Sequence, residues 1–312
     1  MSIYKNNPAL LRSNSSIETI GLIGLGLVGN SVAQRLKDAG YSCVGFDISD
    51  LARSNFENIG FTAAKSVKEV ISISSLIVLT VYDTSGVIQV INEAIEYCKS
   101  HEFIATSKKI HIIDCSTGDP EKLETLDLQL EGSPINLIEA PLSGSSEQIK
   151  EGTSTMLLGG ESTNLENVSD ILNCISSNQI RVGKVGMAAR AKLATNLVLG
   201  LNRAAFAEGM IFAEKMGIDR DTFLNLVLQT PARSDAAVNK GLKMVREDYL
   251  PQSRIRQHLK DVELMIAAAS KKGQRLPLSE THATLMKSAV ANGDGDLDNA
   301  AIIRQIQREF KQ

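Results

Sequence analysis

Lys192 and Asn196 lie in a stretch whose other residues are mostly apolar, GMAARAKLATNLVLGLNRAAFAEG at residues 186–209. An unpaired ammonium is costly to bury in an apolar core, so this lysine needs a compensating environment. In a helix the two side chains, four residues apart, share one face, and Arg203 projects along the same stripe. We therefore expect the stripe to face a cleft. The alternative is a lysine that extends to solvent, with Asn196 capping a local group.

Three glycines, Gly24, Gly26 and Gly29, follow a short apolar run at residues 20–23 and precede an amphipathic pattern. This order and the spacing G-x-G-x-x-G are typical of a dinucleotide-binding loop between a strand and a helix. The first glycine permits the tight turn, the second lets a pyrophosphate approach the backbone, and the third allows close helix packing. The diphosphate would lie at the positive end of the helix. The residues expected to bind the cofactor here are Gly24, Leu25, Gly26, Leu27, Val28 and Gly29.

Asp47 ends the next apolar run, YSCVGFDIS, at 18 residues beyond Gly29. An acid at about this distance accepts hydrogen bonds from the ribose 2'-hydroxyl of NAD and repels the 2'-phosphate of NADP. The sequence therefore favours NAD as cofactor. NADP is the alternative, because Arg53 lies close enough to soften this preference. A solvent-facing aspartate at the end of a strand is the other interpretation of Asp47.

Further apolar runs at residues 75–81, 109–114 and 135–142 alternate with helical patterns around 64–72, 86–99 and 119–128. This alternation predicts a parallel sheet with helices on both faces. Ligands gather beyond the carboxyl ends of the strands in such sheets. Turn chemistry is the alternative explanation for the small polar residues found there. The candidate ligand contacts at these ends are Val81, Ser116, Thr117, Ser143 and Gly144.

The predicted fold class is α/β, with an N-terminal Rossmann domain, a doubly wound and mostly parallel sheet, followed by an all-α C-terminal domain. We expect a disordered tail at residues 1–16, with a short transit peptide as the alternative. The dinucleotide-binding domain would span residues 17–182 and the helical substrate and oligomerisation domain residues 183–312, with a cleft where they meet. The helical patterns of the second half cover residues 187–217, 219–229, 233–247, 252–273, 278–292 and 298–310.

Composition narrows the class of protein. With 43% apolar and 22% charged residues among 312, the chain is typical of a globular protein of two domains. A net charge of −3 gives no basic excess, so we expect neither nucleic-acid nor membrane partners. The four cysteines are widely spaced, which favours reduced thiols, no metal site and a cytoplasmic location. A mitochondrial matrix location is the alternative if the tail is a transit peptide.

Four segments together resemble the β-hydroxyacid dehydrogenase family, over roughly residues 18–310. GLIGLGLVGNSVAQRL is similar to its cofactor fingerprint, and EAPLSGSSEQIKEGTSTMLLGG to its substrate-binding motif. GKVGMAARAKLATN is similar to its catalytic motif, and HLKDVELMIAAA to a carboxy-terminal Lys-Asp signature. The resemblance implies NAD(P)-dependent oxidation of a small β-hydroxy acid of the 3-hydroxyisobutyrate, glycerate or threonate type. It also implies a homodimer or homotetramer.

By this resemblance Lys192 is the catalytic lysine, base in oxidation and acid in reduction, with Asn196 as its partner. An ordinary lysine has a pKa of about 10.4, so this role requires a partly desolvated site. Ser143 and the backbone N–H groups of Gly144 and Ser145 would bind the substrate carboxylate, so that Ser143 also belongs to the catalytic group. Lys260, followed by Asp261, would reach cofactor or substrate. No histidine lies in a context that makes it the preferred base.

Ser145, Thr195 and Tyr82 depart from the family's usual residues, and these departures leave the substrate open. One alternative is an NADPH-dependent reductase of small aldehydes such as glyoxylate or succinic semialdehyde. A second is a nucleotide-binding protein without turnover, since fold does not guarantee function. The intact pair Lys192 and Asn196 argues against that second alternative and against the imine reductases.

Overall fold

The computed structural model describes residues 19–104 and 108–309, so the tail predicted at residues 1–16 lies outside the described residues. By its internal contacts the chain divides into two compact units, Met1–Lys192 and Leu193–Gln312. The strands end at Gly183, close to the change of architecture predicted at residue 183. The boundary between the units falls about ten residues later, inside a long helix, α10 (Met187–Lys215).

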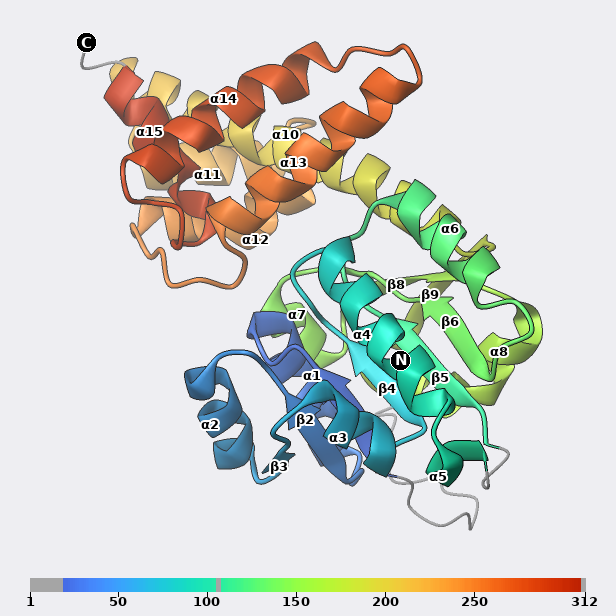
Figure 1. Cartoon of the computed structure of the whole chain (residues 1–312). Coiled ribbons are helices and arrows are strands. Elements are labelled where there is room, and N and C mark those ends of the chain that lie inside the picture. The colour runs from blue at the N-terminus through green and yellow to red at the C-terminus, as the bar shows by residue number, and fades with distance from the viewer. Residues whose placement is uncertain (1–18, 105–107, 310–312) are drawn as a thin grey trace, which may run out of the picture. The chain divides into compact units, whose positions relative to one another are not determined.

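The first unit is built on a sheet that, within the described residues, has nine strands in the order β3-β2-β1-β4-β5-β6-β8-β7, with β9 paired to β8 (Figure 1). The six strands from β1 to β6 run parallel to their neighbours in this order. Strand β8 runs antiparallel to β6 and β7. The order reverses at β1 and β4, which places the topological switch point beside the glycine-rich loop. The strands are β1 (Ile20–Ile23), β2 (Cys43–Phe46), β3 (Thr62–Ala63), β4 (Leu76–Leu79), β5 (Ile110–Asp114), β6 (Ile135–Glu139), β7 (Leu142–Ser143), β8 (Thr155–Gly159) and β9 (Asn178–Gly183).

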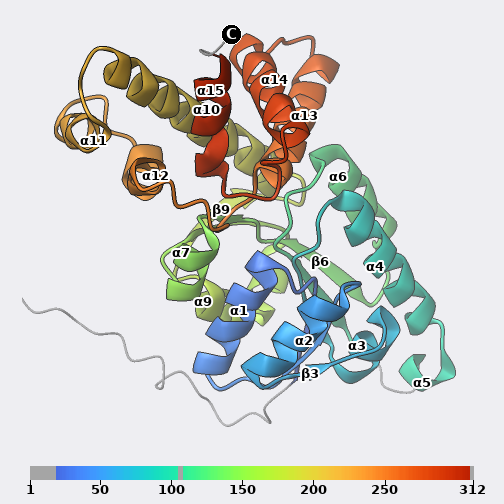
Figure 2. The ribbon, with the colours of Figure 1, turned by 90° about the vertical axis from the view of Figure 1, so that its left-hand side faces the viewer.

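Helices cover both faces of this sheet, as predicted (Figure 1). The helices of the first unit are α1 (Leu27–Asp38), α2 (Asp50–Ile59), α3 (Val67–Ile73), α4 (Thr84–Cys98), α5 (His101–Ile104), α6 (Pro120–Gln129), α7 (Ser146–Glu151), α8 (Ser162–Asn167) and α9 (Ser169–Ile175). On one face α1 packs against α7 and α9 (Figure 2). The other face is covered by α3, α4 and α6.

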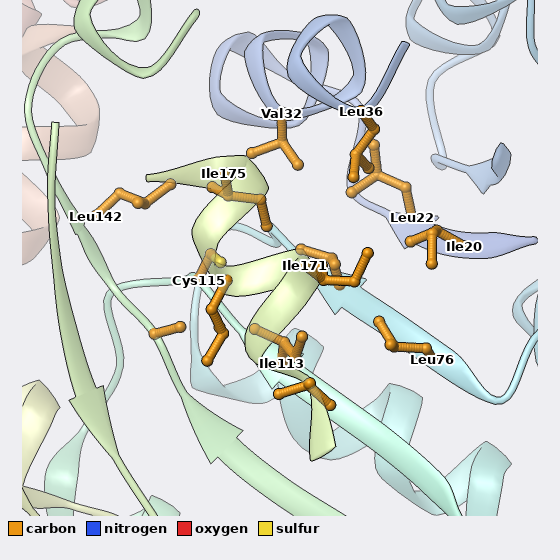
Figure 3. Close-up of a cluster of buried hydrophobic side chains, with 14 of the residues drawn as sticks. Ile20, Leu22, Val32, Leu36, Leu76, Ile113, Cys115, Leu142, Ile171 and Ile175 are labelled. Carbon is orange, nitrogen blue, oxygen red and sulfur yellow. The ribbon is translucent and has the colours of Figure 1, made fainter. Parts of the chain in front are cut away.

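Successive side chains of each strand point to opposite faces and so enter two separate hydrophobic clusters. On the α1 side, Leu22 and Ile113 meet Leu36 of α1 and Ile171 of α9 (Figure 3). On the other side, residues such as Ile77 pack against α3, α4 and α6. Because both faces are buried, the strands are continuously apolar, which is the pattern that predicted a parallel sheet.

Two features of the first unit differ from the prediction. The apolar run at residues 135–142 forms two strands, β6 and β7, because Pro141 has no N–H to donate to a sheet and interrupts the run. The segment 146–183, to which no strand or helix was assigned from the sequence, forms α7, β8, α8, α9 and β9. Its elements have only five to seven residues each, too few for a periodic pattern to be clear.

The second unit consists of helices within its described residues, as predicted. Its elements are the rest of α10, then α11 (Arg220–Gln229), α12 (Asp235–Val245), α13 (Ile255–Lys271), α14 (Pro277–Ala291), the 3-10 helix η2 (Asn299–Ala301) and α15 (Ile302–Glu309). Helix α13 packs against α14, α14 against α15, and α11 against α12 (Figure 2). Residues such as Met210, Met244 and Ile303 form its hydrophobic core.

Candidate active site

The glycine-rich loop follows β1 and gives each of its three glycines a distinct environment. Gly24 has φ +92°, and a Cβ there would lie 2.5 Å from the carbonyl oxygen of Thr80. A Cβ on Gly29 would lie 2.0 Å from the carbonyl oxygen of Gly24. Gly26 is exposed, and a Cβ there would meet nothing within 4 Å. Two glycines therefore hold the turn against the sheet and helix, and the middle one leaves open space above the backbone.

This open space lies at the N-terminus of α1. The N-cap residue is Gly26, which supplies no side-chain hydrogen bond to the helix, and the first turn contains no acidic residue. The first N–H groups of a helix lack partners within the helix and carry its positive dipole end. Leu27 and Val28 are half-buried at this point, whereas Leu25 is fully buried. An open backbone at a helix N-terminus without a side-chain cap fits the diphosphate of a dinucleotide.

Asp47 is fixed beside this loop by both of its carboxylate oxygens. Oδ2 accepts a hydrogen bond from the backbone N–H of Leu25 at 2.7 Å, and Oδ1 accepts one from Ser49 N–H at 2.8 Å. Each carboxylate oxygen has a second lone pair with which it can accept a bond from a ligand hydroxyl. The geometry therefore suits a carboxylate that accepts hydrogen bonds from ribose hydroxyl groups.

The Arg53 guanidinium is held against its own part of the chain. It donates to the carbonyl oxygen of Asp47, pairs with the carboxylate of Asp50, and lies 5.8 Å from the centre of the Phe46 ring. Three attachments thus hold the cation that, by the sequence, could have received a 2'-phosphate.

The carboxyl ends of β4 and β5 are joined to each other beside the loop. The Val81 N–H donates to Ser116 Oγ at 3.1 Å, and the Ser116 N–H donates to Asp114 Oδ1 at 2.9 Å. Thr80 Oγ1 donates to the Gly24 carbonyl oxygen and so connects β4 to the loop. The structure thus brings together Val81 and Ser116, while the next residue, Thr117, is half-buried.

Ser143 ends β7, which pairs with β8 so that Ser143 lies opposite Thr155. Gly144 follows with φ +158°, and a Cβ there would lie 3.0 Å from the Cβ of Ser154. The backbone therefore turns closely over β8 immediately after Ser143.

Ser145 caps the helix that follows it, α7. Its N–H donates to Gln148 Oε1 at 2.9 Å, and its Oγ accepts from the Gln148 N–H at 3.3 Å. These two bonds are a capping box at the start of α7, so the Ser145 N–H is already used. The sequence analysis did not interpret the spacing of Ser145 and Gln148 as a helix cap, and contact of this N–H with a substrate carboxylate stays a prediction.

Lys192 lies against the segment that carries Ser143. Its ammonium donates a hydrogen bond to the carbonyl oxygen of Leu142 at 2.7 Å, and the residue is 6% exposed. The structure therefore brings Lys192 next to the residue that precedes Ser143. A partly desolvated ammonium held at this segment is suited to move a proton to or from a small polar ligand.

Helix α10, which carries Lys192, begins at a buried carboxylate on β6. Glu139 Oε2 accepts from the N–H groups of Gly186 at 2.6 Å and Ala188 at 3.1 Å, and Oε1 accepts from Ala189 at 3.2 Å. Burial raises the pKa of Glu139 to about 7, and the nearby Asp114 also raises it, although the hydrogen bonds from the helix lower it. No role was predicted for Glu139 from the sequence, in which it is an acidic residue at the end of an apolar run.

The second unit holds a separate group around Asp261 of α13. The Asn196 amide nitrogen donates to Asp261 Oδ2 at 3.3 Å, and the Lys260 ammonium lies 3.0 Å from Asp261 Oδ1. Asn196 and Asp261 are both buried, and Lys260 is partly exposed. Asp261 was recognised as part of a signature but was assigned no function. The structure shows that it orients Asn196, four residues after Lys192 on α10.

Arg203 does not extend the polar stripe in the way that the sequence suggested. It is 4% exposed within the second unit, and burial lowers the pKa of its guanidinium to about 10, an effect opposed by Asp298. His258 and His282 are buried in the same unit with ring centres 5.5 Å apart. A Cβ on Gly200 would lie 2.4 Å from His258 Nε2, so the histidine packs directly on α10. Arg203 thus belongs to the interior of the helical unit.

The described ranges 19–104 and 108–309 lack two further kinds of feature. No group of three or more His, Cys, Asp or Glu side chains is arranged to hold a metal ion in them. None of the helices there is long and apolar enough to span a bilayer.

Comparison with known proteins gives two successive family matches. Residues 19–185 match the NAD binding domain of 6-phosphogluconate dehydrogenase. Residues 186–306 match the domain described as NAD-binding of NADP-dependent 3-hydroxyisobutyrate dehydrogenase. The first match alone covers more than half of the chain.

Individual relatives agree with these matches over nearly their whole length. The chain is 26% identical to 2-hydroxy-3-oxopropionate reductase of Escherichia coli, over 92% of this chain and 97% of that protein. It is also 26% identical to L-threonate dehydrogenase of Cupriavidus necator, over 91% of this chain and 95% of that protein. The crystal structure of a 3-hydroxyisobutyrate dehydrogenase from Salmonella typhimurium superposes with a TM-score of 0.80 at 26% identity, covering 92% of this chain and 99% of that one. Together with the dinucleotide loop, these matches show that the chain is an NAD(P)-dependent oxidoreductase of the β-hydroxyacid dehydrogenase family.

Proposed function

We propose that the protein catalyses reversible hydride transfer between NAD and a small β-hydroxy acid, with Lys192 as the proton carrier. The observation that carries this proposal is the Lys192 ammonium, buried and 2.7 Å from the Leu142 carbonyl oxygen, one residue before Ser143. A lysine held beside a substrate-binding motif can take the hydroxyl proton in oxidation and return it in reduction. When bound, the nicotinamide cofactor supplies the hydride acceptor or donor.

Ser143 and Gly144 are the proposed substrate-binding residues of the first unit. The Ser143 hydroxyl can donate to a carboxylate, and the backbone after it turns closely at Gly144. Holding the carboxylate at one point leaves the carbon that bears the hydroxyl in a fixed orientation, which is a large part of catalysis. In this proposal the carboxylate of the substrate binds next to the lysine that carries the proton.

Asn196 is proposed to position the reacting groups, as the resemblance implied. Its amide nitrogen donates to Asp261, which fixes the amide and makes its oxygen the acceptor side of the group. An amide oxygen oriented in this way is suited to receive a hydrogen bond from an ammonium. Lys260, paired with Asp261, is proposed to contact the cofactor.

The first test is a panel of hydroxy acids assayed by the absorbance of the reduced cofactor. We expect NAD-dependent oxidation of at least one β-hydroxy acid of the 3-hydroxyisobutyrate, glycerate or threonate type. We also expect kcat/KM for NAD to exceed that for NADP by at least about tenfold, which corresponds to about 1.4 kcal/mol of discrimination by Asp47. The Asp47→Asn variant should lose most of this ratio while the wild-type substrate order is kept.

Three outcomes of the same panel would contradict the proposal. Turnover of small aldehydes with NADPH, without oxidation of any β-hydroxy acid, would support the aldehyde reductase instead. Binding of NADH without turnover of any compound would support a nucleotide-binding protein. A preference for NADP in the wild-type protein would overturn the role given to Asp47.

We further propose a homodimer or homotetramer located in the cytoplasm. Phe212, in the last turn of α10, is 62% exposed, and Met216, just after the end of that helix, is 67% exposed. Val238 and Leu242 are exposed one turn apart on α12. Apolar side chains that recur on helical surfaces are typical of interfaces between chains. The free thiols of all four cysteines support a reducing compartment.

Light scattering after size exclusion tests the oligomer. The wild-type protein should elute at two or four times the chain mass, and Phe212→Glu should weaken association by at least about tenfold, because a charge would be buried at an apolar contact. Leu128→Glu, at an exposed leucine of α6 in the first unit, is the matched control and should leave the mass unchanged. A monomeric wild-type protein would contradict the proposal.

A further inference from the structure

Glu139 is buried, 1% exposed, at the end of β6, and it makes three hydrogen bonds to another element. The donors are the N–H groups of Gly186, Ala188 and Ala189 at the start of α10. The first N–H groups of a helix have no partners within the helix, and a carboxylate there is favoured by the helix dipole. A single side chain thus satisfies three backbone donors of the helix that carries Lys192.

The fit around this carboxylate is close. Gly159 of β8 lies opposite Glu139 in the sheet, and a Cβ there would be 2.6 Å from Glu139 Oε2. The absence of a side chain at Gly159 therefore makes room for the carboxylate between the sheet and the helix. A second contact lies three residues farther along the chain, where the Leu142 carbonyl oxygen accepts the Lys192 ammonium.

Residues 139–142 therefore form hydrogen bonds with α10 at two places. Ala188, bonded to Glu139, and Lys192, bonded to Leu142, are four residues apart and share one face of the helix. We propose that Glu139 is a positioning residue for Lys192: its carboxylate fastens the first turn of α10 and thereby sets where the ammonium lies beside Ser143. This inference rests on the proposed role of Lys192 as proton carrier.

The protonation state of Glu139 should affect this attachment. An ionised carboxylate accepts on both oxygens, whereas a protonated one carries an O–H that cannot accept from a helix N–H in the same place. The charged groups that face Glu139 are Asp114 on β5 and Arg190 on α10, and Arg190 is itself paired with Glu124 on α6. Because burial and Asp114 raise the pKa of Glu139 to about 7, the carboxylate loses its charge as the pH falls through neutrality. The three-bond attachment is therefore complete above that range and weakened below it.

The test compares Glu139→Gln and Glu139→Asp with the wild-type protein in kcat against pH and in amide hydrogen exchange of residues 186–189. Glu139→Gln should lower kcat for reduction by about tenfold to a hundredfold at pH 8, since small misplacements of a catalytic group have effects of this size. It should also abolish the fall in kcat below pH 7, leave the KM of the cofactor within about twofold, and raise exchange at the three amides. Glu139→Asp should keep an acid limb, because it retains an ionisable group.

Glu124→Gln is the matched control. It removes the partly exposed carboxylate that pairs with Arg190, a residue in the first turn of α10. It should leave kcat at pH 8 within about twofold of the wild type and keep an acid limb, because Glu139 remains ionisable. A Glu139→Gln variant that melts at a lower temperature but keeps wild-type kcat and an acid limb would overturn the positioning role. Full turnover by a Lys192→Ala variant would instead overturn the proposed function, while the change in amide exchange in Glu139→Gln would persist, so the two failures are distinguishable.

Discussion

Replacing Lys192 with alanine is expected to lower kcat by about 10²-fold to 10⁴-fold, the usual contribution of a general acid or base. Lys192 is buried and donates to the Leu142 carbonyl oxygen beside Ser143, so its loss removes the proton carrier without touching the glycine-rich loop. The dissociation constant of NADH, measured by quenching or energy transfer in fluorescence, should therefore stay within a factor of about two, because no cofactor contact changes.

Two further variants separate chemistry from packing. Lys192→Met keeps most of the side-chain volume and should be as inactive as Lys192→Ala, whereas a purely structural role would be rescued by it. Lys192→Arg keeps the positive charge but cannot give up its proton near neutral pH, so it should also be inactive in oxidation. Lys184→Ala, an exposed lysine just before α10, is the control and should retain full activity.

Substituting valine for Gly26 is expected to abolish cofactor binding while leaving the fold intact. Gly26 has φ −72°, which any residue can adopt, and a Cβ there would meet nothing within 4 Å. The added side chain would occupy the space above the N-terminus of α1 in which we expect the diphosphate. The Kd for NADH should rise by roughly a hundredfold or more, because losing about 3 kcal/mol of interaction corresponds to that factor.

Gly24→Ala provides the contrasting variant within the same loop. Gly24 has φ +92°, and a Cβ there would lie 2.5 Å from the Thr80 carbonyl oxygen, so this substitution should lower the melting temperature. Gly26→Val should leave the melting temperature of the protein without cofactor within about 2 °C of the wild type, a small effect on the scale of single substitutions. Tight NADH binding by Gly26→Val would show that the diphosphate does not bind at this loop.

The sequence predicted the parts of the fold that repeat a strong pattern. β1 and α1 were found because an apolar run, three spaced glycines and a helical period occur together at residues 20–38. The helices of the second unit were found because each is long enough for its apolar period to be clear. The strands and helices of residues 146–183 were not predicted. They are short and depend on pairing with distant segments for their stability.

The residues of the candidate site left different signals in the sequence. Lys192 and Ser143 were identified from the polar interruption of an apolar helix and from the motif, and the structure places Lys192 beside Leu142 in the same unit. The local use of Ser145 was missed, because a side chain that caps a helix has the same sequence signal as one that binds a ligand. The capping role of Glu139 could not be found, since its partners lie 47 to 50 residues away in the chain.

The rate of hydride transfer in a single turnover tests the role of Lys192 most directly, because it isolates the chemical step from product release. Wild-type protein and Lys192→Ala would each be saturated with NAD and then mixed with the best hydroxy acid of the panel. The absorbance of the reduced cofactor would be followed. We predict that the rate falls by at least about a hundredfold in Lys192→Ala, with NADH affinity unchanged. An equal rate in the two proteins would show that Lys192 does not carry the proton.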